Sequence, residues 1–205
     1  TYKLRYSFNA LSYFTFYNYK KLNSLYNIYK DRPIIIVGNG PSLNNTPLDD
    51  FLKVPAIGMN KINLLFPKIS WRPTMILCSN RLVIKQNADF FTNANIPVYL
   101  SWKGRRVLAK KKRNNVNYYL ELPSNSFRKN IPFGISVSST VTDACLQFAY
   151  FTGANPVILF GIDHNYSFQG NPNEIATMKE NDLNHFDKDY FAKGQHWGIP
   201  NLATS

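Results

Sequence analysis

One stretch, residues 34–43, constrains the fold of this chain more than any other. Its first four residues are β-branched and apolar, which predicts a strand buried on both faces of a sheet. The strand ends at Gly38, Asn39 and Gly40, where two glycines permit backbone angles that a side chain would forbid. A buried strand of this kind is typical of a parallel sheet that helices cover.

A short helix is expected directly after the glycine turn. Thr46 suits the N-cap position, and Pro47 suits the first helical position. Because a strand, a glycine turn and a helix can surround a phosphate with backbone N–H groups, the turn is predicted to bind part of a nucleotide, with Pro41 and Ser42 included. The motif is no P-loop, and Leu43 stands where a dinucleotide fingerprint has its third glycine.

Strands and helices alternate along the rest of the chain. Further strands are expected at residues 54–58, 74–78, 97–101, 116–122 and 156–160, the last of them buried, and helices at 62–66, 82–92, 140–152 and 174–183. Residues 123–137 and 184–205 lack periodicity and are expected to be irregular. The alternation predicts an α/β fold: a single Rossmann-like domain over residues 31–205, with a mostly parallel sheet and helices on both faces.

The two ends of the chain carry separate signals. Apolar residues recur at helical spacing over residues 3–30, so residues 1–30 are expected to form an amphipathic helix that packs on the core. The start at Thr1 and the abrupt end at Ser205 indicate a fragment of a longer protein.

Small or polar residues follow four of the predicted strands. In open parallel sheets, ligands bind outside the carboxyl ends of the strands, so these residues are expected to meet at one site. Asparagine offers both a donor and an acceptor, which suits the reading of a base or a ribose. The strand-end candidates are Gly38, Asn39, Gly40, Asn60, Ser79, Asn80, Gly161, Asp163 and His164.

The formal charge of +12 favours a polyanionic partner. Seven lysines and arginines lie between Lys103 and Arg113, which predicts a contact with an anionic membrane surface. No nucleic-acid motif accompanies this cluster, and no run of 18 apolar residues occurs. We therefore expect a cytoplasmic protein in peripheral contact with the inner face of the membrane, with no nucleic-acid partner.

Cys78 and Cys145 lie in apolar surroundings and are expected to be buried free thiols. No spacing of cysteine and histidine suggests zinc, so no metal site is predicted.

Three blocks resemble known bacterial families. Residues 35–43 resemble the opening strand and turn of the sialyltransferases of glycosyltransferase family 42, and equally of the MptE-like domains (domain of unknown function 115). Residues 139–166 are similar in their capped helix, glycine, apolar strand and Gly-Ile-Asp, and residues 185–198 resemble the C-terminal signature of the MptE-like group. The resemblance implies a glycosyltransferase of bacterial surface glycan synthesis that uses a CMP-linked, sialic-acid-like sugar donor, without metal or cofactor. Besides the donor, its partner would be a glycan or a lipid-linked acceptor. The formation of a homo-oligomer stays open as an alternative to a single chain.

The resemblance also implies roles for single residues. Asn39 would contact the phosphate or ribose of the donor, and Asn60 would contact the nucleotide. Ser138, Ser139 and Thr140 match the start of the cytidine-binding helix, with one of the two serines as its expected cap.

The same resemblance points to the reacting groups. Tyr166 matches a tyrosine that holds the donor phosphate, and His196 is the nearest match to the general base. His164 is a second candidate base, and we interpret His185 as a surface residue. Histidine suits this role because its charge changes near neutral pH.

Two alternatives stay open. An MptE-like diphosphokinase would use ATP and Mg²⁺, which requires carboxylates at the rim, where Asp163 is the obvious candidate. A nucleotide- or glycan-binding module without catalysis is the other. The segment Thr140 to Thr142 departs from the Ser-Gly pair of the sialyltransferases, so another sugar than sialic acid is also open.

Overall fold

The computed structural model describes residues 18–108, 115–123, 126–136, 140–165, 171, 174–180 and 182–199. A six-stranded sheet lies at its centre in the order β5-β4-β3-β2-β1-β8, and all neighbouring strands are parallel. The strands are β1 (Ile34–Val37), β2 (Ala56–Met59), β3 (Met75–Cys78), β4 (Val98–Ser101), β5 (Val116–Tyr119) and β8 (Val157–Phe160).

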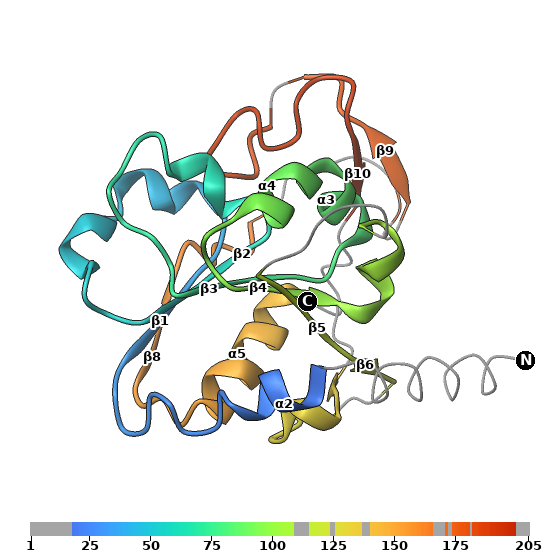
Figure 1. Cartoon of the computed structure of the whole chain (residues 1–205). Coiled ribbons are helices and arrows are strands. Elements are labelled where there is room, and N and C mark those ends of the chain that lie inside the picture. The colour runs from blue at the N-terminus through green and yellow to red at the C-terminus, as the bar shows by residue number, and fades with distance from the viewer. Residues whose placement is uncertain are drawn as a thin grey trace, which may run out of the picture.

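Helices cover both faces of this sheet (Figure 1). The helices α2 (Asn18–Asn23) and α5 (Val141–Phe151) lie on one side, and α3 (Arg81–Gln86) and α4 (Ala88–Asn93) lie on the other. The chain therefore has the Rossmann-like α/β arrangement that the sequence predicts. The 3-10 helices are η1 (Pro41–Asn45), η2 (Leu48–Phe51), η3 (Ile62–Leu65), η4 (Trp102–Arg106) and η5 (Ile131–Phe133).

Two small sheets complete the described part of the chain. The strands β6 (Glu121–Leu122) and β7 (Ile135–Ser136) pair in parallel, and β9 (Ile175–Thr177) pairs antiparallel with β10 (His196–Gly198). The prediction of a helix at 174–183 is therefore wrong, because residues 175–177 form β9, which pairs with β10 about twenty residues further along the chain. The irregular stretch predicted at 123–137 in fact contains η5 and β7.

The core forms around the middle strands. Every residue of β1, β2, β3 and β4 is buried, as their apolar sequences predict. The prediction of a buried strand at 156–160 is wrong in one respect, because β8 lies at one edge of this sheet and is only half-buried. Leu159 keeps 46% of its surface exposed.

Several predicted helices begin or end elsewhere. The helix expected after the glycine turn is two 3-10 helices, and the hydroxyl of Thr46 donates to the carbonyl of Ser42 (3.0 Å) instead of capping a new helix. Asn87 divides the helix expected at 82–92 into α3 and α4. The N-cap of α5 is Thr140, and Ser138 and Ser139 lie outside the described residues.

The N-terminal helix is shorter than predicted within the described residues. α2 ends at Asn23, and turns follow up to residue 31. Leu22 and Leu25 are buried in the core, so this segment packs on the domain, whereas residues 1–17 lie outside the described part. No helix among the described residues is both long enough and apolar enough to cross a bilayer.

Candidate functional site

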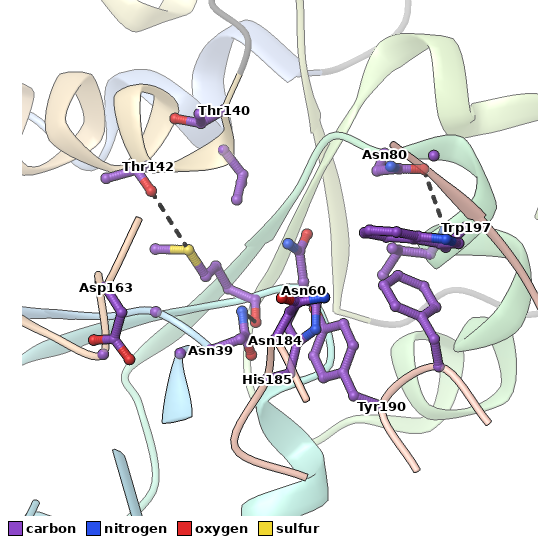
Figure 2. Close-up of a pocket in the computed structure, with 18 of the residues that line it drawn as sticks. Asn39, Asn60, Asn80, Thr140, Thr142, Asp163, Asn184, His185, Tyr190 and Trp197 are labelled. Atoms are coloured by element: carbon purple, nitrogen blue, oxygen red, sulfur yellow. Dashed lines mark hydrogen bonds between the residues drawn. The ribbon is translucent and has the colours of Figure 1, made fainter. Parts of the chain in front are cut away.

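A cavity of about 410 Å³ opens at the carboxyl ends of β1, β2, β3 and β8. The first turn of α5 and parts of residues 182–199 complete its wall (Figure 2). Ten predicted residues line it: Gly38, Asn39, Gly40, Asn60, Ser79, Asn80, Thr140, Gly161, Asp163 and His164. The topology thus brings the polar strand ends together, as the rule for parallel sheets predicts.

Other predicted residues lie elsewhere. Pro41, Ser42 and His196 are not among the residues that line the cavity. Tyr166, like the two serines before Thr140, lies outside the described residues.

The backbone of the glycine turn already has partners within the protein. The amide of Gly38 donates to the carbonyl of Phe160 (2.8 Å), and the amide of Gly40 donates to that of Gly161 (2.9 Å). The amide of Ser42 donates to Asp163 Oδ2 (2.8 Å), and its hydroxyl donates to Asp163 Oδ1. A carboxylate therefore occupies part of the place where the sequence predicts a phosphate.

Two asparagines offer acceptors to a ligand. Asn39 is 7% exposed, and its Nδ2 donates to the carbonyl of Met59 (3.1 Å), which fixes the amide in place. Asn39 Oδ1 and Asn60 Oδ1 are buried and have no hydrogen-bond partner among the described residues. Since unpaired buried acceptors are costly, these two oxygens favour a ligand that donates hydrogen bonds, such as one with hydroxyl groups.

Asn80 lines the cavity and also caps a helix. Its Oδ1 accepts from the amides of Leu82 (2.8 Å) and Val83 (3.4 Å) at the start of α3. This side chain is therefore held by its own helix at the far end of the cavity, beside Trp197 (Figure 2).

His196 points away from the cavity. Side chains alternate between the two faces of β10, where Trp197 is buried and His196 is exposed. The ring Nδ1 of His196 lies 3.0 Å from the hydroxyl of Thr177 on β9. The structure therefore places the predicted base outside the site, whereas His164 lines it as an exposed residue with a φ of 47°.

The histidine that the sequence analysis interpreted as a surface residue lines the cavity. His185 Nδ1 lies 2.7 Å from Oδ2 of Asp182, whose side chain is almost fully buried. The ring of His185 stacks on that of Tyr190, with 3.8 Å between centroids and 2° between planes. A carboxylate and an aromatic ring together fix the position and the angle of this imidazole.

Lys61 connects the segment that carries His185 and Tyr190 to the central sheet. It follows β2 and is buried, and its ammonium group donates to the carbonyl of Tyr190 and lies 4.7 Å from the centroid of the Phe191 ring. Burial lowers the pKa of Lys61 to about 8, and the charge of Asp182 partly opposes that effect. Lys61 therefore supports the two residues that hold His185.

The described residues contain no group of three or more histidines, cysteines or carboxylates that could hold a metal ion. Cys78 and Cys145 are buried and free, as predicted, and burial raises the pKa of both thiols.

The basic cluster at 103–113 is described only up to residue 108. Within η4, Lys103 forms an ion pair with Glu121 (2.9 Å), and the guanidinium of Arg105 lies over the ring of Trp102.

Comparisons with known proteins assign no role to any residue of this site. No protein-family model matches the chain, and no curated protein matches it. The fold is similar to a solved structure described as the MAf glycosyltransferase from Magnetospirillum magneticum AMB-1, with a TM-score of 0.48 and 16% identity. The likeness covers 90% of this chain and 32% of that protein, so the chain spans about a third of its neighbour's length.

Proposed function

We propose that this chain is a glycosyltransferase domain that uses a nucleotide-activated sugar, with His185 as the general base. The observation that carries the proposal is the pair of Asp182 and His185 in a cavity at the carboxyl ends of a parallel sheet. A buried carboxylate beside an imidazole is the arrangement that prepares histidine for proton transfer.

The reaction needs one proton acceptor at the acceptor hydroxyl. The oxygen of that hydroxyl would form a bond to the anomeric carbon while the bond from that carbon to the leaving phosphate breaks. His185 would take the hydroxyl proton on Nε2, because the hydrogen bond to Asp182 favours the tautomer with its proton on Nδ1. Asp182 is then a positioning residue that would also stabilise the imidazolium.

The donor would lie across the strand ends. The unpaired oxygens of Asn39 and Asn60 can accept hydrogen bonds from ribose or sugar hydroxyls, whereas an amide oxygen has no hydrogen to donate to an ionised phosphate oxygen. Of the two roles implied for Asn39, contact with the ribose is therefore the better supported. The first turn of α5, at Thr140 to Thr142, would present its positive dipole end to the leaving phosphate.

The finer parts of the proposal rest on the resemblance of the three sequence blocks. They are a CMP-linked, sialic-acid-like donor, catalysis without a metal, and a role in bacterial surface glycan synthesis. Asp163, the carboxylate that a Mg²⁺-dependent diphosphokinase would need, has both oxygens hydrogen-bonded to Ser42.

The test measures nucleotide binding and turnover together. Thermal shifts with CMP, UDP, GDP, ADP, and ATP with Mg²⁺ identify the nucleotide, and release of that nucleotide from its sugar conjugates gives the rate. We expect His185→Ala to lower kcat by about 100-fold or more and to leave the thermal shift unchanged.

His196→Ala is the matched control, because this histidine lies outside the cavity, and it should keep the wild-type rate. Wild-type turnover in His185→Ala would overturn the mechanism. A shift with ATP and Mg²⁺ alone would favour the diphosphokinase, and binding without turnover in the wild type would favour the binding module.

A further inference from the structure

Exposed aromatic side chains gather on one face of the molecule. Of the ten large hydrophobic side chains that are exposed among the described residues, six lie around α2, η5 and the end of α5. They are Tyr19, Tyr26, Ile28, Phe127, Phe133 and Tyr150. We refer to these six residues as the aromatic face.

Contacts between rings join the elements of this face. α2 packs against η5, and η5 packs against α5. The ring pairs are Tyr19 with Phe133 (5.3 Å between centroids), Phe127 with Tyr150 (5.7 Å) and Tyr26 with Phe151 (5.3 Å). The exposed rings are therefore held in place by neighbours from other elements.

Positive charge surrounds these rings. The segments 18–33 and 126–134, which carry five of the six residues, contain six lysines and arginines and one acidic residue, Asp31. Lys129 places its ammonium group 5.6 Å from the centroid of the Tyr150 ring. Long basic side chains beside exposed aromatic rings are typical of the interface between lipid head groups and acyl chains.

We propose that the aromatic face binds the surface of an anionic lipid bilayer. The phenylalanine and tyrosine rings would enter the head-group region, and the surrounding lysines and arginines would contact anionic phosphates. The excess of basic over acidic residues favours a lipid surface over a second copy of this chain, whose equal charge would oppose the contact.

The geometry leaves the cavity accessible in the bound state. α5 begins at the cavity and reaches the aromatic face at Tyr150, and eleven helical residues span about 16 Å. In Figure 1, β9 and β10 at the cavity lie on the opposite side of the molecule from α2. A bilayer bound to the aromatic face would therefore leave the cavity facing water.

Vesicle sedimentation tests this surface with the full chain. We expect binding to phosphatidylcholine vesicles that contain about a quarter phosphatidylglycerol, weaker binding as salt rises, and little binding to pure phosphatidylcholine. Each basic residue near such a surface contributes roughly fivefold to the binding constant. Lys20→Glu with Lys129→Glu should therefore weaken binding by about 25-fold or more.

Two further variants distinguish binding through the aromatic face from binding through the net positive charge of the protein. Lys53→Glu with Lys85→Glu makes the same change of charge at exposed positions outside the face, and it should weaken binding much less. Phe127→Ser with Phe133→Ser keeps the charge and should also reduce binding, because the rings no longer enter the head groups.

Three outcomes would overturn the proposal. They are equal losses from the two lysine pairs, wild-type binding by the phenylalanine variant, and self-association in solution that is lost in the face variants while vesicles are not bound. Thermal denaturation of each variant shows that it is folded. Because the readout is lipid binding alone, it stands apart from the proposed transferase activity.

Discussion

Replacing Gly40 with alanine is expected to destabilise the protein, because the new methyl group would meet the carboxylate of Asp163. A Cβ atom at Gly40 would lie 2.3 Å from Asp163 Oδ2 and 2.5 Å from its Cγ. The backbone itself does not require glycine here, since a φ of −69° with a ψ of 160° suits any residue. The contact with Asp163 therefore sets the whole cost.

The magnitude follows from the bonds that must break. To admit the methyl group, Asp163 has to turn away from Ser42, whose amide and hydroxyl both donate to it. A hydrogen bond to a charged group contributes roughly 1.5–3 kcal/mol when it is shielded, and less at an exposed site such as this. Two weakened bonds give about 2 kcal/mol, which lowers the Tm of a chain of this size by roughly 4–8 °C.

Thermal denaturation of a double-mutant cycle is the assay. In the Asp163→Ala background the nearest remaining atom is the Cβ of residue 163, at 3.0 Å, which a small shift relieves, so Gly40→Ala should cost at least about 1 kcal/mol less there than in the wild type. Gly38→Ala is the control, because its methyl group would lie 2.2 Å from the backbone oxygen of Gly161 and should be equally damaging in both backgrounds. Simple additivity of the Gly40 and Asp163 substitutions would refute the reasoning.

Two further predictions concern buried titratable groups. Burial lowers the pKa of Lys61 from 10.5 in the unfolded chain to about 8 in the folded protein. Between these pH values the unfolded chain binds more protons than the folded protein, so this lysine increases the free energy of unfolding as pH rises. Urea denaturation from about pH 7 to about pH 9.5 should show that rise in the wild type relative to Lys61→Met, and parallel curves would contradict it. Cys78 and Cys145, whose thiol pKa burial raises, should react with a thiol reagent at about pH 8 only as fast as the protein unfolds. Faster labelling of the Cys78→Ser or the Cys145→Ser variant would show that the remaining thiol is accessible.

The sequence predicts the sheet well because its strands carry a strong local signal. The apolar run from Ile34 to Val37 predicts a buried strand, and the strands at 74–78 and 97–101 follow the same pattern of short apolar runs between turns. The polar residues after those strands then meet at one rim by topology alone. The position of the nine strand-end residues around the cavity was therefore predictable before any side-chain contact was known, whereas Thr140 was implied only by the family resemblance.

The late part of the site was not predictable in this way. His185 differs from His196 largely through contacts that the sequence does not show. They are the stacking of its ring on Tyr190, the long-range support of that segment by Lys61, and the pairing of β9 with β10. The local signal that could have found it is the spacing of Asp182 and His185, three residues apart, among aromatic residues. At the break between α3 and α4, Asn87 Nδ2 likewise makes a contact that the local sequence does not indicate, a hydrogen bond to Asn63 Oδ1 (2.7 Å).

The position of β8 has a consequence for how the protein loses structure. This strand is held by β1 on one side only in the described sheet, yet Gly161 and Asp163 at its end form a wall of the cavity. Detachment of an edge strand disrupts one ladder, whereas detachment of β1 would disrupt two. Partial opening at β8 would therefore dismantle the site while five strands stay paired, so we expect inactivation to occur before global unfolding in this fold.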